Sequence, residues 1–206
     1  GHFMLTPNSN QVAGLQCSIV PMKHVSASTD MDEDVEKEVE NFKRCLRQMW
    51  AAQGLGCLFV ETVLGIGKKP HTSIQCFAVP EEVEEDSPLY FKQALDDADE
   101  EWSQHKKIYQ LTRQKTLRST IPKNFAYFAV EWLGGGYAHV IEDEDKFSRN
   151  FGADVISGML GNDGGIRCDT KGRAKEKGGN SFEADKARVM TFLSSWKPHD
   201  WTTELG

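Results

Sequence analysis

The chain has 206 residues, of which 39% are hydrophobic and 10% aromatic, and its formal net charge at pH 7 is −7. This apolar content predicts a folded globular protein rather than a disordered one, and the negative charge argues against a uniformly basic nucleic-acid binder. No run of residues approaches the roughly 20 apolar side chains of a membrane span, and we see no secretory signal, so we expect an intracellular protein without a membrane partner.

The first part of the chain predicts a strand and a long helix. The strand covers residues 15–22 and ends at Pro21, which cannot donate a ladder hydrogen bond. The helix covers residues 31–53, with Ser28 or Thr29 as its N-cap and acidic residues in its first turn. Its apolar stripe recurs at spacings of three and four and consists of Val35, Val39, Phe42, Leu46 and Met49.

Two more strands follow this helix, over residues 57–63 and 71–80. Because their connection is short, we predict that they are antiparallel neighbours. The helix then covers one face of an antiparallel sheet, which is an α+β layer.

An acidic stretch at residues 81–88 marks a predicted boundary between a first unit, residues 1–84, and a second unit, residues 85–206. Ser87 and Pro88 open a helix that runs to about residue 110. The later elements are a strand over 124–133, a glycine turn at 134–136, a returning strand over 137–142, and helices over 147–160 and 181–195. The sequence therefore predicts an α+β protein of two modules, the second built from a hairpin and helices.

The cysteines predict neither a disulfide framework nor a zinc site within the chain. Their number is odd and no two are spaced as C-x-x-C, which leaves buried reduced thiols as the simplest interpretation. They are Cys17, Cys45, Cys57, Cys76 and Cys168.

Basic side chains gather in two segments of this acidic chain. Residues 103–123 contain no acid but carry Lys106, Lys107, Arg113, Lys115, Arg118 and Lys123. The second segment carries Arg167, Lys171, Arg173, Lys175 and Lys177. Such asymmetry indicates either a local anion-binding face or an ordinary solvated surface.

The stretch H-T-S-I-Q-C-F at residues 71–77 alternates polar and apolar side chains, which predicts a half-buried strand with His71, Ser73 and Gln75 on one face. Alternate residues on such a face lie roughly 6.5–7 Å apart. Three histidines so arranged hold a nucleotide phosphate, and the central imidazole attacks phosphorus. Here the central position is a serine, and His71 is too distant to serve as its general base. We therefore predict no catalytic residue.

This stretch resembles a degenerate histidine-triad motif, and V-P-M-K-H, ending at His24, resembles the earlier strand-end histidine of that family. The whole of residues 15–201 is more specifically similar to the C-terminal region of the CwfJ-type splicing proteins. These are nineteen-like members of the complexed-with-Cdc-five group, related to the partner of the lariat-debranching enzyme. The matching motifs are P-L-Y-F-K-Q-A-L-D-D-A-D-E-E-W-S at 88–103, G-G-Y-A-H-V-I-E-D at 135–143, F-G-A-D-V-I-S-G-M-L at 151–160 and W-K-P-H-D-W at 196–201.

The resemblance implies a nuclear protein of the late spliceosome that acts on the excised intron lariat and its turnover. The expected partners are spliceosome components, the lariat-debranching enzyme and intron-lariat RNA. It also implies a histidine-triad-like module at residues 1–84 and a second CwfJ module at residues 85–206. Relatives often carry a Cys-rich zinc element upstream, which leaves open a metal in the longer protein, but we predict no cofactor or metal ligand in this chain.

Three functional interpretations remain. The first, which we favour, is a pseudo-enzyme that binds RNA or another spliceosome component. The second is a residual nucleotide hydrolase or phosphodiesterase that uses His71. The third is a protein-interaction platform with an acidic face at residues 81–101. The candidate ligand residues are His24, Lys68, Lys69, His71, Ser73, Gln75, Lys106, Lys107, Arg113, Lys115, Arg118, Lys123 and His139. Lysine and arginine supply phosphate contacts, and Tyr109 and Tyr137 are stacking platforms or core residues. His139 contacts a ligand or is a structural histidine.

Overall fold

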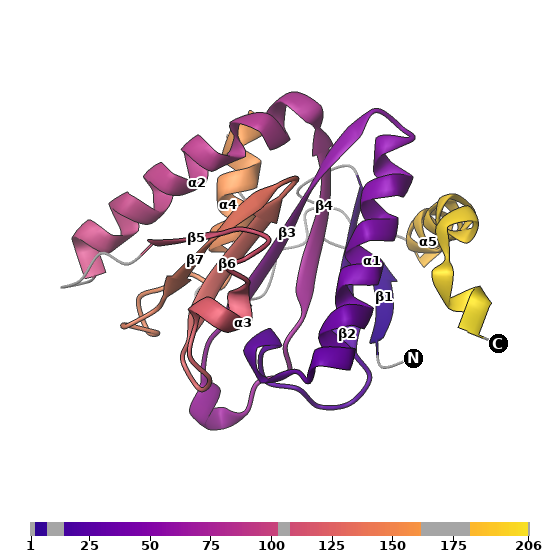
Figure 1. Cartoon of the computed structure of the whole chain (residues 1–206). Coiled ribbons are helices and arrows are strands. Elements are labelled where there is room, and N and C mark those ends of the chain that lie inside the picture. Colours follow the sequence, from indigo (N-terminus) through magenta and orange to yellow (C-terminus); the bar gives the residue numbers. More distant parts are fainter. Residues whose placement is uncertain (1–2, 8–14, 103–107, 162–181, 206) are drawn as a thin grey trace.

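One seven-stranded sheet forms the centre of the fold, with the strand order β1-β2-β4-β3-β6-β7-β5 and antiparallel pairing throughout (Figure 1). The computed structural model describes residues 3–7, 15–102, 108–161 and 182–205. The strands are β1 (Phe3–Pro7), β2 (Leu15–Pro21), β3 (Leu55–Val63), β4 (Ile74–Pro80), β5 (Ile108–Leu111), β6 (Tyr127–Trp132) and β7 (Gly135–Val140). The predicted α+β class and the antiparallel pairing of β3 with β4 are confirmed.

The helices pack on both faces of this sheet (Figure 1). They are α1 (Glu33–Ala51), α2 (Glu81–Trp102), α3 (Leu117–Thr120), α4 (Phe151–Met159) and α5 (Phe182–Trp196). Short 3-10 turns are η1 (Ser28–Asp30), η2 (Ile66–Lys68), η3 (Lys197–His199) and η4 (Trp201–Leu205). No helix among the described residues is long and apolar enough to cross a membrane.

Alternation along β3 separates the two faces of the sheet. Cys57 and Phe59 pack with the apolar stripe of α1, whereas Leu58 and Val60 pack with α2 and α4. Successive side chains of a strand point to opposite faces, so α1 lies on one side of the sheet and α2 and α4 lie on the other. Four of the predicted stripe residues, Val39, Phe42, Leu46 and Met49, are buried, and Val35 is partly buried against them.

The C-terminal helix α5 completes the α1 side of the core. Phe42 of α1 lies 6.1 Å from the ring centroid of Trp196 and 5.4 Å from that of Trp201. The W-K-P-H-D-W motif therefore contributes its two tryptophans to the packing around α1. The four described cysteines are buried free thiols, as predicted, and Cys168 lies outside the described residues.

Several element boundaries differ from the sequence expectation. The N-cap of α1 is Asp32, because the chain first makes the η1 turn at Ser28–Asp30, where the Thr29 side chain is buried. Pro88 lies inside α2 rather than at its start. A proline cannot donate to the carbonyl four residues earlier, and here the Ser87 hydroxyl donates to the Glu84 carbonyl at 2.7 Å.

Two later helix boundaries also differ from the expectation, because contacts with distant parts of the chain outweigh the local helical pattern. The helix expected to reach residue 110 ends at Trp102, and Ile108 already pairs with His139 as part of β5. Helix α4 starts at Phe151 rather than near Phe147, whose ring packs against Phe128 in the core.

The sheet runs without interruption across the boundary that we predicted at residue 84. Strand β3 pairs with β4 on one side and with β6 on the other, and α2 continues directly from the end of β4. The division into two units at residues 1–84 and 85–206 stays a proposal. In this proposal both units contribute strands to the same sheet.

Candidate functional site

Two histidines meet at the corner where β2 ends and β4 approaches its start. The ring centroids of His24 and His71 lie 5.3 Å apart. The Nε2 atom of His71 is 2.9 Å from the Pro21 carbonyl oxygen, and the Nε2 atom of His24 is 3.0 Å from the Lys69 carbonyl oxygen. The sequence placed both histidines in one site, and the structure brings them together.

These two bonds place a hydrogen on the Nε2 atom of each ring. A backbone carbonyl only accepts hydrogen bonds, so each Nε2 acts as the donor. An Nε2 atom that carries this hydrogen has no lone pair with which to accept a further bond while the contact persists.

Gln75 of β4 points to the face of the sheet opposite α1, because its neighbours Ile74 and Cys76 pack on the α1 side. Gln75 is half-buried in β4, opposite Ser18 of β2 and Val60 of β3. The strand starts at Ile74, so His71 and Ser73 precede the hydrogen-bonded ladder instead of extending it, which corrects our expectation for residues 71–77.

The other predicted ligand residues scatter over the surface and the core. Lys68 and Lys69 are exposed beside the histidine corner, as are Arg113, Lys115 and Lys123 in the segment that connects β5 to β6. Lys106, Lys107 and the second basic segment lie outside the described residues.

His139 has a different environment from the surface cations. It is only 5% exposed on β7, and its ring stacks on that of Phe147 at 6.3 Å. Tyr137 packs edge-on against Trp132 at 4.9 Å. As ligand contacts, both residues stay predictions.

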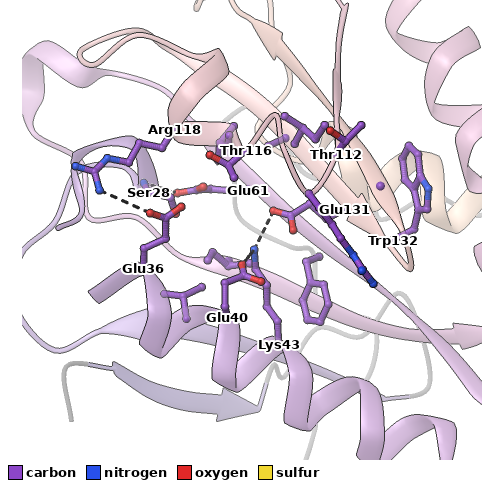
Figure 2. Close-up of a pocket in the computed structure, with 18 of the residues that line it drawn as sticks. Ser28, Glu36, Glu40, Lys43, Glu61, Thr112, Thr116, Arg118, Glu131 and Trp132 are labelled. Carbon is purple, nitrogen blue, oxygen red and sulfur yellow. Dashed lines mark hydrogen bonds and ion pairs between the residues drawn. The ribbon is translucent and has the colours of Figure 1, made fainter. Parts of the chain in front are cut away.

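A cavity of about 560 Å³ lies on the α1 face of the sheet, between α1 and the segment that leads into α3 (Figure 2). The residues that line it include Ser28, Glu36, Glu40, Lys43, Arg47, Phe59, Glu61, Thr112, Arg113, Arg118, Ala129, Glu131 and Trp132. We call this cavity the α1 pocket. Of our predicted ligand residues, it brings together Arg113 and Arg118, and the α1 residues and the buried acids were not predicted.

Lys43 is the central cation of the α1 pocket. Its ammonium group donates to Glu131 at 2.8 Å and to Glu40 at 3.0 Å, and only 6% of its side chain is exposed. Burial by itself lowers the pKa of Lys43, but the two carboxylates outweigh it and hold the pKa above its ordinary value. Lys43 therefore stays charged and neutralises acids on both sides of the pocket.

Glu61 is the buried acid of the α1 pocket. One of its oxygens accepts hydrogen bonds from the Thr72 hydroxyl and from the backbone N–H of Ser28, and the other accepts from the Tyr127 hydroxyl at 2.8 Å. Burial raises the pKa of Glu61, and these hydrogen bonds only partly offset the rise. Because Thr72 follows His71, this carboxylate also links the pocket to the histidine corner.

A signal for the α1 pocket was present in the sequence. Lys43 lies on the apolar side of the α1 helix pattern, and Glu61 and Glu131 interrupt apolar strands on the face that points toward α1. A charged residue at a core-facing position needs a partner. The sequence does not say which partner, because Lys43 and Glu131 are separated by 88 positions.

Among the described residues no group of three or more His, Cys, Asp or Glu side chains is placed to hold a metal ion. The polar features that remain are the histidine corner, the basic segment after β5 and the α1 pocket.

Comparison with known proteins covers almost the whole chain. Residues 2–92 match a family model described as "Protein similar to CwfJ C-terminal", and residues 101–202 match one described as "Protein similar to CwfJ C-terminus 2". The "CWF19-like protein 2" of Homo sapiens is 38% identical over 202 residues, which is 97% of this chain and 22% of that protein.

Two further relatives extend the similarity to distant organisms. The "CWF19-like protein 2 homolog" of Caenorhabditis elegans is 35% identical over 91% of this chain and 39% of its own length. The "Pre-mRNA-splicing factor cwf19" of Schizosaccharomyces pombe is 31% identical over 98% of this chain and 32% of its own length. The chain thus spans about a fifth to two fifths of the relatives it matches.

Proposed function

Because this chain belongs to the family of proteins similar to the CwfJ C-terminus, we propose that it is a non-catalytic RNA- and protein-binding module of a pre-mRNA splicing factor. The Schizosaccharomyces pombe relative is named "Pre-mRNA-splicing factor cwf19", which supports the splicing role. We propose that the module works in the nucleus on the excised intron lariat, during its release, debranching and turnover. Its partners in this proposal are intron-lariat RNA, the lariat-debranching enzyme and other spliceosome components.

The observation that carries RNA binding is the acid-free basic segment between β5 and β6. Arg113, Lys115 and Lys123 are exposed there, and Arg113 also lines the α1 pocket. Exposed cations that face no nearby acid of their own segment are free to neutralise phosphates, which supplies sequence-independent affinity. The net negative charge of the chain then confines RNA to this surface and to the lysines at the histidine corner.

The histidine corner supports binding rather than catalysis. Ser73 stands where the central histidine of a triad would attack phosphorus, and the Nε2 atoms of His24 and His71 are held as donors to backbone carbonyls. With Lys68 and Lys69 exposed beside them, the corner suits contact with an anion. A nucleophile with an adjacent base, which hydrolysis would need, is missing from this group of residues.

A protein-binding surface is favoured by helix α2. Its exposed side chains combine acids with two large apolar groups, Leu89 at 69% and Tyr90 at 50% exposure. Exposed apolar side chains among acids suit a partner segment that is basic and partly apolar. We propose this surface for the protein partner, distinct from the basic segment that serves RNA.

The test measures RNA affinity by fluorescence anisotropy with linear and branched oligoribonucleotides at several salt concentrations. The double variant Arg113→Glu/Lys115→Glu should weaken binding by about tenfold and reduce the slope of log K against log salt by about 1.4, since each phosphate contact to a single strand contributes about 0.7. The control Lys92→Glu/Lys146→Glu makes the same charge change at two exposed lysines elsewhere. Equal affinities for both variants would contradict the proposal.

Catalysis is tested separately with the same RNAs and with dinucleotides. We expect no turnover above that of the His71→Ala variant. Hydrolysis by the purified chain that disappears on this substitution would replace the proposed module with a residual hydrolase.

A further inference from the structure

We propose that the α1 pocket receives one unstacked nucleobase of the bound RNA, while the phosphates on either side of it stay at the pocket rim. This inference rests on the RNA binding proposed above and adds a base-binding site to it. The α1 pocket is distinct from the histidine corner, because its lining includes neither His24 nor His71.

The size and shape of the α1 pocket suit a planar group. Its volume of about 560 Å³ lies within the range of small-molecule sites, roughly 300–1,000 Å³. Phe59 and Ala129 supply an apolar floor from β3 and β6, and Trp132 lies at the end opposite the Glu36–Arg118 pair (Figure 2). A flat heterocycle buries apolar faces on such a floor and leaves its polar edges toward the walls.

The charges inside the α1 pocket favour a neutral occupant over a phosphate. Lys43 is shared between Glu40 and Glu131, and the Glu61 carboxyl is already hydrogen-bonded on both of its oxygens. A phosphate group inside would face the carboxyl groups of Glu40, Glu61 and Glu131, while Lys43 is engaged by two of them and the Arg47 guanidinium lies over the Phe59 ring, 4.7 Å from its centroid. A base carries both donors and acceptors without net charge, so carboxylate and ammonium groups can each bind one of its edges.

The rim of the α1 pocket, in contrast to its interior, favours a phosphate group. Arg113 is exposed there, and Arg118 makes a long ion pair with Glu36, at 3.6 Å. A long pair between partly exposed side chains contributes little to stability. A phosphate can therefore draw the Arg118 guanidinium toward itself without a large cost. Base inside and phosphates outside is thus the orientation that matches the charges of both regions.

The test fills the α1 pocket from α1. Glu40 is an exposed residue of this helix whose side chain reaches the pocket, so Glu40→Trp fills the cavity from its surface side. The substitution also removes one of the two carboxylates paired with Lys43, and Glu131 remains as the other. The matched control is Gln48→Trp, at an exposed position of the same helix outside the lining, and Glu40→Gln separates the loss of charge from the added bulk. Thermal unfolding of each variant establishes that it is folded.

Calorimetric titration compares the four nucleoside 5′-monophosphates with inorganic phosphate. Because stacking and edge contacts belong to the base, we expect at least one monophosphate to bind about tenfold more tightly than phosphate. Glu40→Trp should abolish this advantage and Gln48→Trp should preserve it, whereas Glu40→Gln, which keeps the cavity open, should retain more of it than Glu40→Trp. Removing an acid would by itself strengthen binding of an anion, so a loss in Glu40→Trp reflects the filled pocket.

A second readout uses RNA that contains 4-thiouridine. Photo-crosslinks should map to Phe59, Trp132 and their neighbours in the wild type and disappear in Glu40→Trp. Phosphate that binds as well as every nucleotide, or crosslinks that persist in Glu40→Trp, would overturn the inference.

The outcomes separate this inference from the function on which it rests. RNA binding that responds to the reversal of Arg113 and Lys115 but not to Glu40→Trp would refute the base pocket and leave the RNA module in place. Nucleotide binding lost in Glu40→Trp, without any RNA binding, would support the pocket and refute the RNA module. Failure to bind either ligand would refute both.

Discussion

Replacing Glu61 tests whether the buried carboxyl holds the α1 pocket together. Glu61→Ala removes the acceptor of hydrogen bonds from Thr72, Ser28 and Tyr127, but the Ser28 N–H keeps its bond to the Tyr127 hydroxyl at 3.1 Å, so the Thr72 and Tyr127 hydroxyls are the donors that lose their partner. Each buried donor left without a partner costs about 1–3 kcal/mol, and removal of a buried acid relieves part of the total. We expect the free energy of unfolding to fall by about 3 kcal/mol for Glu61→Ala and by less than about 1 kcal/mol for Glu61→Gln, because glutamine keeps the shape and one acceptor oxygen.

The same carboxyl predicts a pH dependence with a defined sign. Burial raises the pKa of Glu61 above its ordinary value of 4.5, so the folded protein binds this proton more tightly than the unfolded chain does. The Glu61 contribution to stability is therefore lost as the pH rises from 4.5 through the folded pKa. Glu61→Gln has no such proton. The stability of the wild type minus that of Glu61→Gln should be constant below this window, fall across it by about 1.4 kcal/mol per unit of pKa difference, and be constant above it.

Urea unfolding at pH values between about 4 and 8, followed by tryptophan fluorescence, measures both effects. Taking the difference between wild type and Glu61→Gln cancels the carboxylates that they share. A difference that rises with pH would show that Glu61 is stabilised as a carboxylate in the folded state. Equal stabilities of Glu61→Ala and Glu61→Gln would show that its hydrogen bonds do not hold the pocket.

Two further predictions concern the packing around this site. Lys43→Met should lower the free energy of unfolding by about 2–4 kcal/mol, because Glu131 loses its partner. The double change Lys43→Met/Glu131→Met should recover at least half of this loss in the same urea assay. A double variant no more stable than the single one would contradict the pairing. In α4, a Cβ at Gly152 would lie 2.5 Å from a methyl of Val60, whereas one at Gly158 would meet open space. Gly152→Ala should therefore destabilise the protein by about 1–3 kcal/mol, and Gly158→Ala should stabilise it by up to about 1 kcal/mol, as thermal unfolding can measure; the reverse order would mean that α4 does not pack closely on β3.

The sequence predicted those helices and strands whose apolar residues recur with helix or strand spacing within the segment itself. The apolar spacing in α1 and the alternation in β3 follow from helix and strand geometry. The glycine turn predicted at 134–136 is confirmed only at Gly134, which has a positive φ of 92°, because Gly135 and Gly136 already pair with β6 as part of β7. Where local chemistry and tertiary pairing disagreed, the tertiary partner decided. Pro88 favours a helix start, yet α2 begins seven residues earlier, and the helical pattern near residue 108 yields to pairing with β7.

Part of the candidate site was predictable in the same way. The two motifs had already indicated His24 and His71 as one site, but the pairing of β2 with β4, which brings the two rings together, joins strands that α1 and β3 separate in the chain and was not predicted. The roles of Lys68, Lys69 and the basic segment stay predictions until ligand binding is measured.

The amino-acid sequence by itself determined the family and the α+β class, because each depends on residue identity or on periodicity within a few turns. Only the tertiary structure decided where the charges of the α1 pocket find their partners. Lys43 meets Glu131 across 88 residues and Glu61 meets Tyr127 across 66, and both contacts exist because β3 pairs with β6 in one register beneath α1. That register is a property of the whole sheet, since a shift of β3 by one residue would turn Glu61 to the opposite face and a shift of β6 would turn Glu131.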